Sequence, residues 1–405
     1  MKISKLTITI IFLTAVFLQS CQTPEKKAIN NDLDRDALQM LNESRFEEAY
    51  DLSSRSLLRN NNNSQALAVN VISAYVLALL QFRKDVDSLK QSNPISMISE
   101  INRIFENADK NLKQIKNNLN ILELDKNFKF RFTPGNLKID LNGNGMIDPK
   151  EEVLTAIVKD RDGNDIDPRR PEFAFDHSDV LWAQSYISLH LAYISILSSV
   201  DYANFMFFVT GFNSGERKNE ITLKIKSRES LIDGYNYLNQ MLDYSDQTRI
   251  SVLAETDDEF EWLPNLSQKS CPLPMQMSQK IFNNWEVYTG LIRDLLEGKT
   301  VLNFNGLSSG KGNAEDLKAE GGINIKRLFT EPKDAVLNIE QIKLKAAAVD
   351  SDKNLDPFLE EVFGTCYEYN KIPSPIVRKL VEMNRETDKN GAASANRIKY
   401  FLWII

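Results

Sequence analysis

The spacing of apolar residues restricts the fold of this 405-residue chain more than any other feature. From Asp32 to about Leu124, and again from Asp179 to about Phe208, apolar side chains recur every three or four positions and so share one face of a helix. Only 13 prolines and 16 glycines interrupt the chain, and these residues break helices most strongly. We therefore predict a mainly α-helical array, with further helices at 228–245, 275–297, 338–349, 373–385 and 394–405.

Residues 126–139 depart from the helical pattern. Phe128, Phe130 and Phe132 alternate with basic residues, which is typical of a strand. Residues 133–136 read Thr-Pro-Gly-Asn and predict a turn, after which residues 137–139 could return as a second short strand. We expect a small β-hairpin here that leads into the segment that follows.

Residues 140–151 carry oxygen-bearing side chains at regular spacing. They read Asp-Leu-Asn-Gly-Asn-Gly-Met-Ile-Asp-Pro-Lys-Glu, with glycine at the sixth position, where a calcium loop turns sharply. The segment resembles the EF-hand calcium loop over all twelve positions. This resemblance implies Ca²⁺ as the cofactor and implies these ligands: Asp140, Asn142, Asn144, the backbone carbonyl of Met146, Asp148 and Glu151.

The charge of this loop is low, because only three of the implied ligands are carboxylates. Fewer charges mean weaker binding, roughly 10⁻⁵ to 10⁻³ M, toward the range of extracellular calcium modules. The strand-like approach also departs from the helix–loop–helix of the family. We expect a structural calcium ion rather than a sensor, and a loop that binds no metal is the alternative.

A second acidic segment follows. Asp160, Asp162 and Asn164 repeat the first three ligand positions, but Asp165 stands where the family has glycine and Pro171 falls on the last position. The segment is a candidate second metal site, and a solvated acidic turn is the alternative.

The beginning of the chain predicts export. A short basic start and the apolar run from Leu6 to Leu18 precede the sequence Leu-Gln-Ser-Cys, whose cysteine is Cys21. These four residues resemble the bacterial lipobox, which implies that residues 1–20 form a signal peptide and that Cys21 carries the lipid. Residues 21–31 would then be a lipidated tether. The expected location is the outer membrane or cell surface, with the periplasmic face left open.

Charge and the remaining cysteines narrow the partners and chemistry. The formal net charge is −7, and loss of the leader with Lys2 and Lys5 would make it more negative. A nucleic-acid partner would need a basic face, so we expect none. In an oxidising compartment Cys271 and Cys366 could form a disulfide, and two buried free thiols are the alternative.

Three regions are expected after the tether: an N-terminal helical region at 32–125, a strand pair with the calcium loop at 126–170, and a C-terminal helical region at 171–405. Within the first, the step from Phe46 to Ala49 and the polar turn at 60–63 resemble the second half of a tetratricopeptide unit. The resemblance covers one repeat, and a generic helical hairpin is the alternative.

The sequence favours a calcium-binding lipoprotein that acts as a binding or scaffold protein, with a protein partner on its helical surface, and not an enzyme. One alternative is a calcium-dependent hydrolase using Asp176 and His177. Against it, the sequence favours Asp179 as a helix N-cap beside a surface histidine. Another alternative is a ligand-binding lipoprotein serving a transporter, which a deep aromatic-lined pocket would support.

Overall fold

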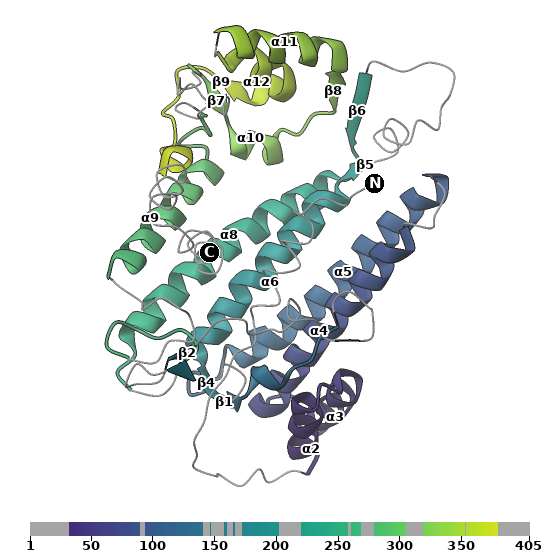
Figure 1. The fold of residues 1–405 in the computed structure, drawn as a ribbon, viewed down its shortest axis with the longest axis vertical. Helices are drawn as coiled ribbons and strands as arrows, with labels where there is room; N and C mark the ends of the chain where they lie inside the picture. The colour runs from purple at the N-terminus through teal and green to yellow at the C-terminus, as the bar shows by residue number, and fades with distance from the viewer. Residues whose placement is uncertain are drawn as a thin grey trace.

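A computed structural model of the chain describes residues 32–89, 94–140, 146, 158–159, 165–166, 172–201, 220–257, 261–268, 279–304, 319–352 and 354–379. Helices make up most of these residues, and the strands are short antiparallel pairs or a three-stranded sheet. The prediction of a mainly α-helical fold is confirmed. Figure 1 shows long helices running side by side, with a small helical hairpin at one end and short helices and strands at the other.

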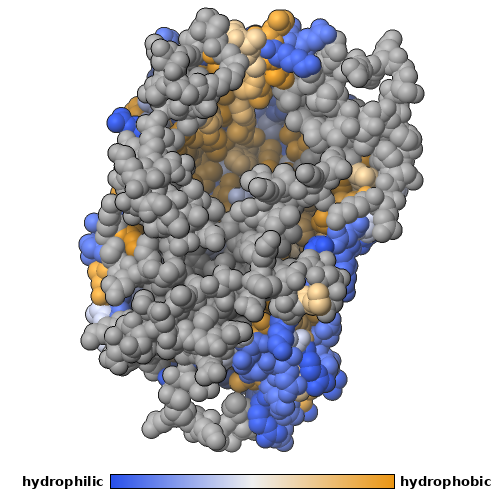
Figure 2. Space-filling view, in the orientation of Figure 1, coloured by the Kyte–Doolittle hydropathy of each residue, from blue (hydrophilic) through white to orange (hydrophobic). Residues whose placement is uncertain are grey.

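Four helices form the N-terminal part: α2 (Asp32–Asn42), α3 (Phe46–Arg59), α4 (Ser64–Leu89) and α5 (Pro94–Leu122). The α2–α3 hairpin turns at Ser44, whose φ is +61°. Its outer surface is largely hydrophilic in Figure 2, whereas Ala37, Leu41, Phe46 and Ala49 are buried. This amphipathic pattern is what the sequence spacing predicts. The tetratricopeptide resemblance stays a prediction.

Helices α6 (His177–Ser198) and α8 (Arg228–Ala254) form the centre of the C-terminal part, and α6 packs between α5 and α8. A Cβ at Gly234 would lie 2.7 Å from the Ile196 side chain, so glycine allows α6 and α8 to approach closely. Helix α6 ends about ten residues earlier than expected. The reason is that β5 (Val200–Asp201) leaves the helix axis to pair with β6 (Glu220–Ile225).

The remaining elements cover one end of this helix pair. Helix α9 (Gln279–Leu296) packs on α8, and α10 (Ile325–Thr330), α11 (Ile339–Asp352) and α12 (Asp356–Phe363) follow. Strand β8 (Ala335–Asn338) joins β6, and β7 (Gly322–Ile323) pairs with β9 (Tyr367–Glu368). The short one-turn helices are η1 (Pro134–Asn136) and η2 (Gly364–Cys366). These short strands carry too little alternation to be seen in the sequence.

The strand expected near residue 130 is present, but its partner differs from the expected one. Strand β1 (Lys129–Phe132) pairs antiparallel with β4 (Phe173–Asp176), with Phe130 opposite Phe175. Residues 137–139 form no strand, because Leu137 and Ile139 are buried in the hydrophobic core instead. The long-range pairing brings β1 directly beside the start of α6. A separate two-residue pair joins β2 (Val158–Lys159) to β3 (Asp165–Ile166).

Two hydrophobic clusters support the start of α6. The larger cluster includes buried side chains of α2 to α6 and of β1. The smaller one is mostly aromatic and consists of Phe173, Trp182, Tyr186, Val252, Trp262, Leu263, Phe282 and Trp285. Because β4 and α6 contribute to both clusters, the first turn of α6 is fixed on two sides.

Two described helices, α4 and α6, are long and apolar enough to cross a membrane by length and composition. Much of each lies against other helices of the bundle, and α6 contributes to both hydrophobic clusters. A helix that is hydrophobic all round is also what the core of a large helical protein requires. Of the apolar window in each helix, 44% in α4 and 61% in α6 is buried inside the fold.

Candidate metal centre

The first turn of α6 is closed by a capping box. Asp176 is the N-cap, and its Oδ1 accepts from the backbone N–H of Ser178 at 2.8 Å and of Asp179 at 3.4 Å. In return, Asp179 Oδ2 accepts from the N–H of Asp176 at 2.9 Å. This corrects the expectation that Asp179 is the cap, because it occupies the third helical position. The reciprocal bonds hold both carboxylates at one helix end.

A third carboxylate, that of Glu261, reaches the same place from the segment between α8 and α9. Its neighbour Trp262 is completely buried. The indole lies 5.5 Å from the Phe173 ring, 5.7 Å from Phe175 and 5.9 Å from Trp182, between centroids. Glu261 itself forms a β-bridge with Ala174 of β4. Aromatic packing therefore sets the position of an acidic side chain.

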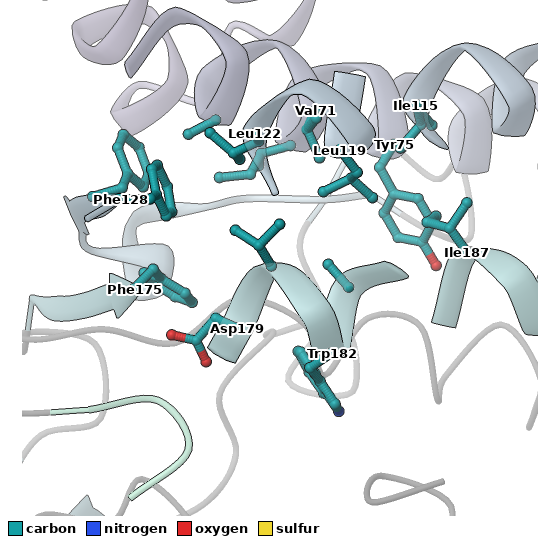
Figure 3. Close-up of a pocket in the computed structure, with 15 residues that line it drawn as sticks. Val71, Tyr75, Ile115, Leu119, Leu122, Phe128, Phe175, Asp179, Trp182 and Ile187 are labelled. Carbon is teal, nitrogen blue, oxygen red and sulfur yellow. The ribbon is translucent and has the colours of Figure 1, made fainter. Parts of the chain in front are cut away.

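Carboxylate oxygens of Asp176, Asp179 and Glu261 all lie within 4.8 Å of one another. Asp179 is 6% exposed and Glu261 is 3% exposed. Asp179 Oδ1 is buried and has no hydrogen-bond donor. In Figure 3 the Asp179 carboxylate points away from Leu119 and Leu122, which lie across the apolar cavity. This acidic triad could hold a metal ion.

A fourth carboxylate lies behind the triad. Ser178 Oγ lies 2.5 Å from Asp176 Oδ1 and is also hydrogen-bonded to Glu255 Oε1, at the end of α8. A hydroxyl has one proton and cannot donate to both oxygens fully. The second oxygen of Glu255 is buried without a partner. Burial, followed by the charge of Asp176, raises the pKa of Glu255 to about 8.

Burial and the neighbouring carboxylates both shift the pKa of Asp179 upward. Burial raises its pKa well above the ordinary value, and the charges of Asp176, Glu261 and Glu255 raise it further. Only the backbone hydrogen bond from Asp176 acts in the opposite direction. The charges of described residues that shift this pKa most are thus all negative. The donor set consists of carboxylate oxygens, which suit hard cations such as calcium, magnesium and manganese.

His177 does not complete a catalytic arrangement with the described residues around it. Its Nε2 lies 2.9 Å from Lys126 Nζ, and its Nδ1 is buried without a partner. Burial and then the charge of Lys126 lower the pKa of the imidazole. The Ser178 hydroxyl contacts Asp176 and Glu255 rather than the histidine. The expected pairing of Asp176 with His177 as a base is therefore not seen in these contacts.

Most residues of the predicted sites lie outside the described part of the chain. Within the calcium loop, Asp140 and Met146 are described, and the Met146 side chain is 66% exposed. The others outside the description are Cys21, Asn142, Asn144, Asp148, Glu151, Asp160, Asp162, Asn164 and Cys271. Cys366 is buried and has no disulfide partner among the described residues, and burial raises the pKa of its thiol. Its pairing with Cys271 stays a prediction.

An apolar cavity of about 100 Å³ lies between α4, α5, β1, β4 and α6. Its walls include Tyr75, Phe128, Phe175 and Trp182, which Figure 3 shows around the same space. Asp179 is the one acidic residue among the residues that line it. The acidic triad and this cavity share the first turns of α6.

The chain matches no protein-family model, no curated protein and no solved structure. The interpretation of the site therefore depends on its residues. Sequence reasoning singled out Asp176 and Asp179 but missed Glu255 and Glu261. Nothing in their spacing connects them to α6, because the contact depends on where Trp262 packs. The buried tryptophan beside an acidic residue was the one available signal.

Proposed function

We propose that this chain is a lipid-anchored, calcium-binding protein outside the cytoplasm, whose helical body serves as a binding or scaffold surface. The observation that carries the proposal is where the twelve-residue loop begins. Asp140, its first implied ligand, directly follows Ile139, which is 1% exposed in the larger hydrophobic cluster. An ion bound there would be tied to the core of the protein, which favours a structural role.

The approach to the loop is also tied to the N-terminal hairpin. The backbone N–H of Lys138 donates to Ser44 Oγ at 2.8 Å, and Ser44 Oγ donates to the Asn136 carbonyl at 3.2 Å. The Asn136 side chain donates to Asn42 Oδ1 at 3.1 Å. Calcium in the loop would therefore stabilise the α2–α3 hairpin together with the core. A loop fastened in this way suits a staple better than a moving sensor.

Calcium titration followed by thermal melting tests this proposal. For wild type we expect calcium to raise the melting temperature. Calcium at a hundred times its dissociation constant would add about 2.7 kcal/mol to the free energy of unfolding. Glu151→Gln should lose the part of this rise that comes from the loop. Glu106→Gln, an exposed change on α5, should keep the full rise. No melting shift in wild type would overturn the proposal.

The lipid anchor is tested separately. Metabolic labelling with a fatty acid should mark the wild-type chain, and membrane fractionation should recover it with membranes. Cys21→Ser should abolish both results, because the thiol that receives the lipid is gone. Labelling that persists in this variant would contradict anchoring through Cys21.

The apolar cavity supports a second candidate, a ligand-binding lipoprotein serving a transporter. A volume of about 100 Å³ is smaller than the ~150 Å³ cavity that holds benzene in an engineered protein. It would admit only a small apolar group. Xenon should raise the melting temperature if the cavity accepts ligands, and the absence of a shift would count against this candidate.

A further inference from the structure

We propose that Asp176, Asp179 and Glu261 form a second calcium site, which clamps the segment at 261–268 onto the start of α6. This site lies outside the twelve-residue loop and is built from described residues. Its geometry does not depend on the proposed function. Only the supply of calcium rests on the proposed location outside the cytoplasm, where this ion is abundant.

One carboxylate oxygen of Asp179 is buried without a hydrogen-bond donor. This oxygen is Oδ1, and Asp179 as a whole is more than nine-tenths buried. One of its carboxylate oxygens lies within 4.8 Å of an oxygen of Asp176 and of Glu261. A buried charge is expensive unless it is paired or coordinates a metal. The backbone N–H groups of Asp176, Ser178 and Asp179 are already bonded to Asp176 Oδ1 and Asp179 Oδ2. A cation is the partner that this oxygen lacks.

The separation of the three carboxylate oxygens fits a bound metal ion. Calcium binds oxygen at about 2.4 Å, so two ligands on opposite sides of the ion can be about 4.8 Å apart. The three carboxylate oxygens lie within 4.8 Å of one another. Magnesium, at about 2.1 Å, would also fit if the oxygens lie closer together, so calcium is preferred for its abundance outside the cytoplasm rather than for its size. The absence of histidine and cysteine from the triad also disfavours zinc and softer metals.

The helix dipole opposes the binding of a cation at the N-terminal end of α6. The dipole amounts to about half a positive charge, and it acts mainly within the first turn. The triad offers three carboxylates to a bound ion. The negative charge therefore exceeds the opposing partial charge several-fold. The dipole also explains how the carboxylates are held together before an ion binds.

The clamp would complete contacts that already fold the segment back onto α8. The Asn265 side chain donates to the Glu255 carbonyl at 2.8 Å, and Asn265 N–H donates to Gln268 Oε1 at 2.8 Å. Trp262 fills the aromatic cluster beneath. Calcium between Glu261 and the α6 cap would join β4, α6 and this segment at one point. The inferred role is to fix the connection between α8 and α9.

Isothermal calorimetry on the full chain in detergent, with calcium as the only added metal, tests this site. Wild type should bind at two classes of site. Glu151→Gln should keep one of them, and Glu151→Gln combined with Glu261→Gln should keep none. Glu106→Gln should behave like wild type. If Glu151→Gln binds no calcium, or if Glu261→Gln alone keeps both sites, the inference is overturned.

Terbium luminescence excited through tryptophan locates the ion, because Trp262 is adjacent to Glu261. Glu151→Gln should keep the sensitised signal, whereas Glu261→Gln and Asp179→Asn should each weaken terbium affinity at least tenfold. Asp179→Asn can still accept the Asp176 N–H and should keep the helix cap. It is therefore the test variant to use if circular dichroism shows that Glu261→Gln does not fold. A signal lost in Glu151→Gln and retained in both other variants would overturn the inference. A signal lost in Glu261→Gln alone supports it even if the loop binds nothing.

Discussion

The N–H of Asp176 donates to Asp179 Oδ2 at 2.9 Å, and the other oxygen of the same Asp179 carboxylate is buried without a donor. One side chain thus closes the helix end with one oxygen and leaves the other oxygen of the same carboxylate, which belongs to the acidic triad, without a donor. The capping box fixes the angle of the carboxylate, so the open oxygen is directed by local structure. Capping and metal binding are therefore separable by mutation at this helix end.

The capping role of Asp176 gives the first prediction. In the presence of a chelator, Asp176→Ala should lower the free energy of unfolding by about 0.5–2 kcal/mol relative to Asp176→Asn. Both variants remove the same charge, but only asparagine keeps an acceptor for the Ser178 and Asp179 N–H groups. Urea unfolding of the two variants measures the difference. Equal stability of the pair would contradict the capping assignment.

Trp262 gives the second prediction, because its ring anchors the segment that carries Glu261. Trp262→Ala should cost about 3–5 kcal/mol of stability, as expected for a large buried aromatic side chain. Trp262→Phe should cost less, since much of the ring contact with Phe173 survives. The matched control is Leu266→Ala in the same segment, whose side chain is 44% exposed. If chemical unfolding gave the control and Trp262→Ala the same cost, the anchoring role would be wrong.

How far the sequence could predict this fold depends on how local the signal is. The helices that include Phe46, Leu119 and Tyr186 follow from apolar spacing within a few turns. The partner of β1 does not, because the choice between residues 137–139 and β4 depends on which side chains fill the core. Ile139 is buried there as irregular chain, so its apolar character gave a misleading strand signal.

The site shows the same limit. Asp176 and Asp179 stand three residues apart at a helix start, and their proximity follows from helix geometry. Glu261 reaches them only because Trp262 packs between Phe173 and Trp182, a tertiary contact that no spacing encodes. Its role therefore becomes visible only with the fold. The predicted calcium loop is the opposite case, since its implied ligands lie within twelve residues of sequence and are recognised without tertiary information.

The apolar cavity gives the third prediction, in two opposite directions. Val180 is buried and lines the cavity, so Val180→Ile should gain up to about 0.8 kcal/mol by adding one methylene to empty space. Leu119→Ala on the facing helix enlarges the cavity and should cost about 2–5 kcal/mol. Urea unfolding measures both changes. A loss of stability in Val180→Ile comparable to that in Leu119→Ala would show that the cavity is already filled.

Lys116 gives the last prediction, which concerns pH. Its Nζ donates to Gln184 Oε1 at 3.2 Å and to Ser188 Oγ at 2.9 Å, and lies 4.8 Å above the Tyr244 ring. Burial lowers the pKa of this amine to about 8, and the charge of Glu123 only partly opposes the shift. The folded protein therefore bears the cost of a buried ammonium at neutral pH.

Between pH 8 and about 10.5 the folded state loses this proton while the unfolded state keeps it. The unfolded state then binds more protons, so the free energy of unfolding attributable to Lys116 rises with pH. Wild type should gain stability relative to Lys116→Met between pH 7 and pH 10. Lys113→Met is the matched control, because the hydrogen bond that Lys113 donates to Asp109 raises the pKa of this amine in the folded state, so it stays charged there over this range as it largely does in the unfolded state. The difference in unfolding free energy between wild type and Lys113→Met should stay constant over this range. If the difference between wild type and Lys116→Met also stays constant, burial does not destabilise the charged form of Lys116.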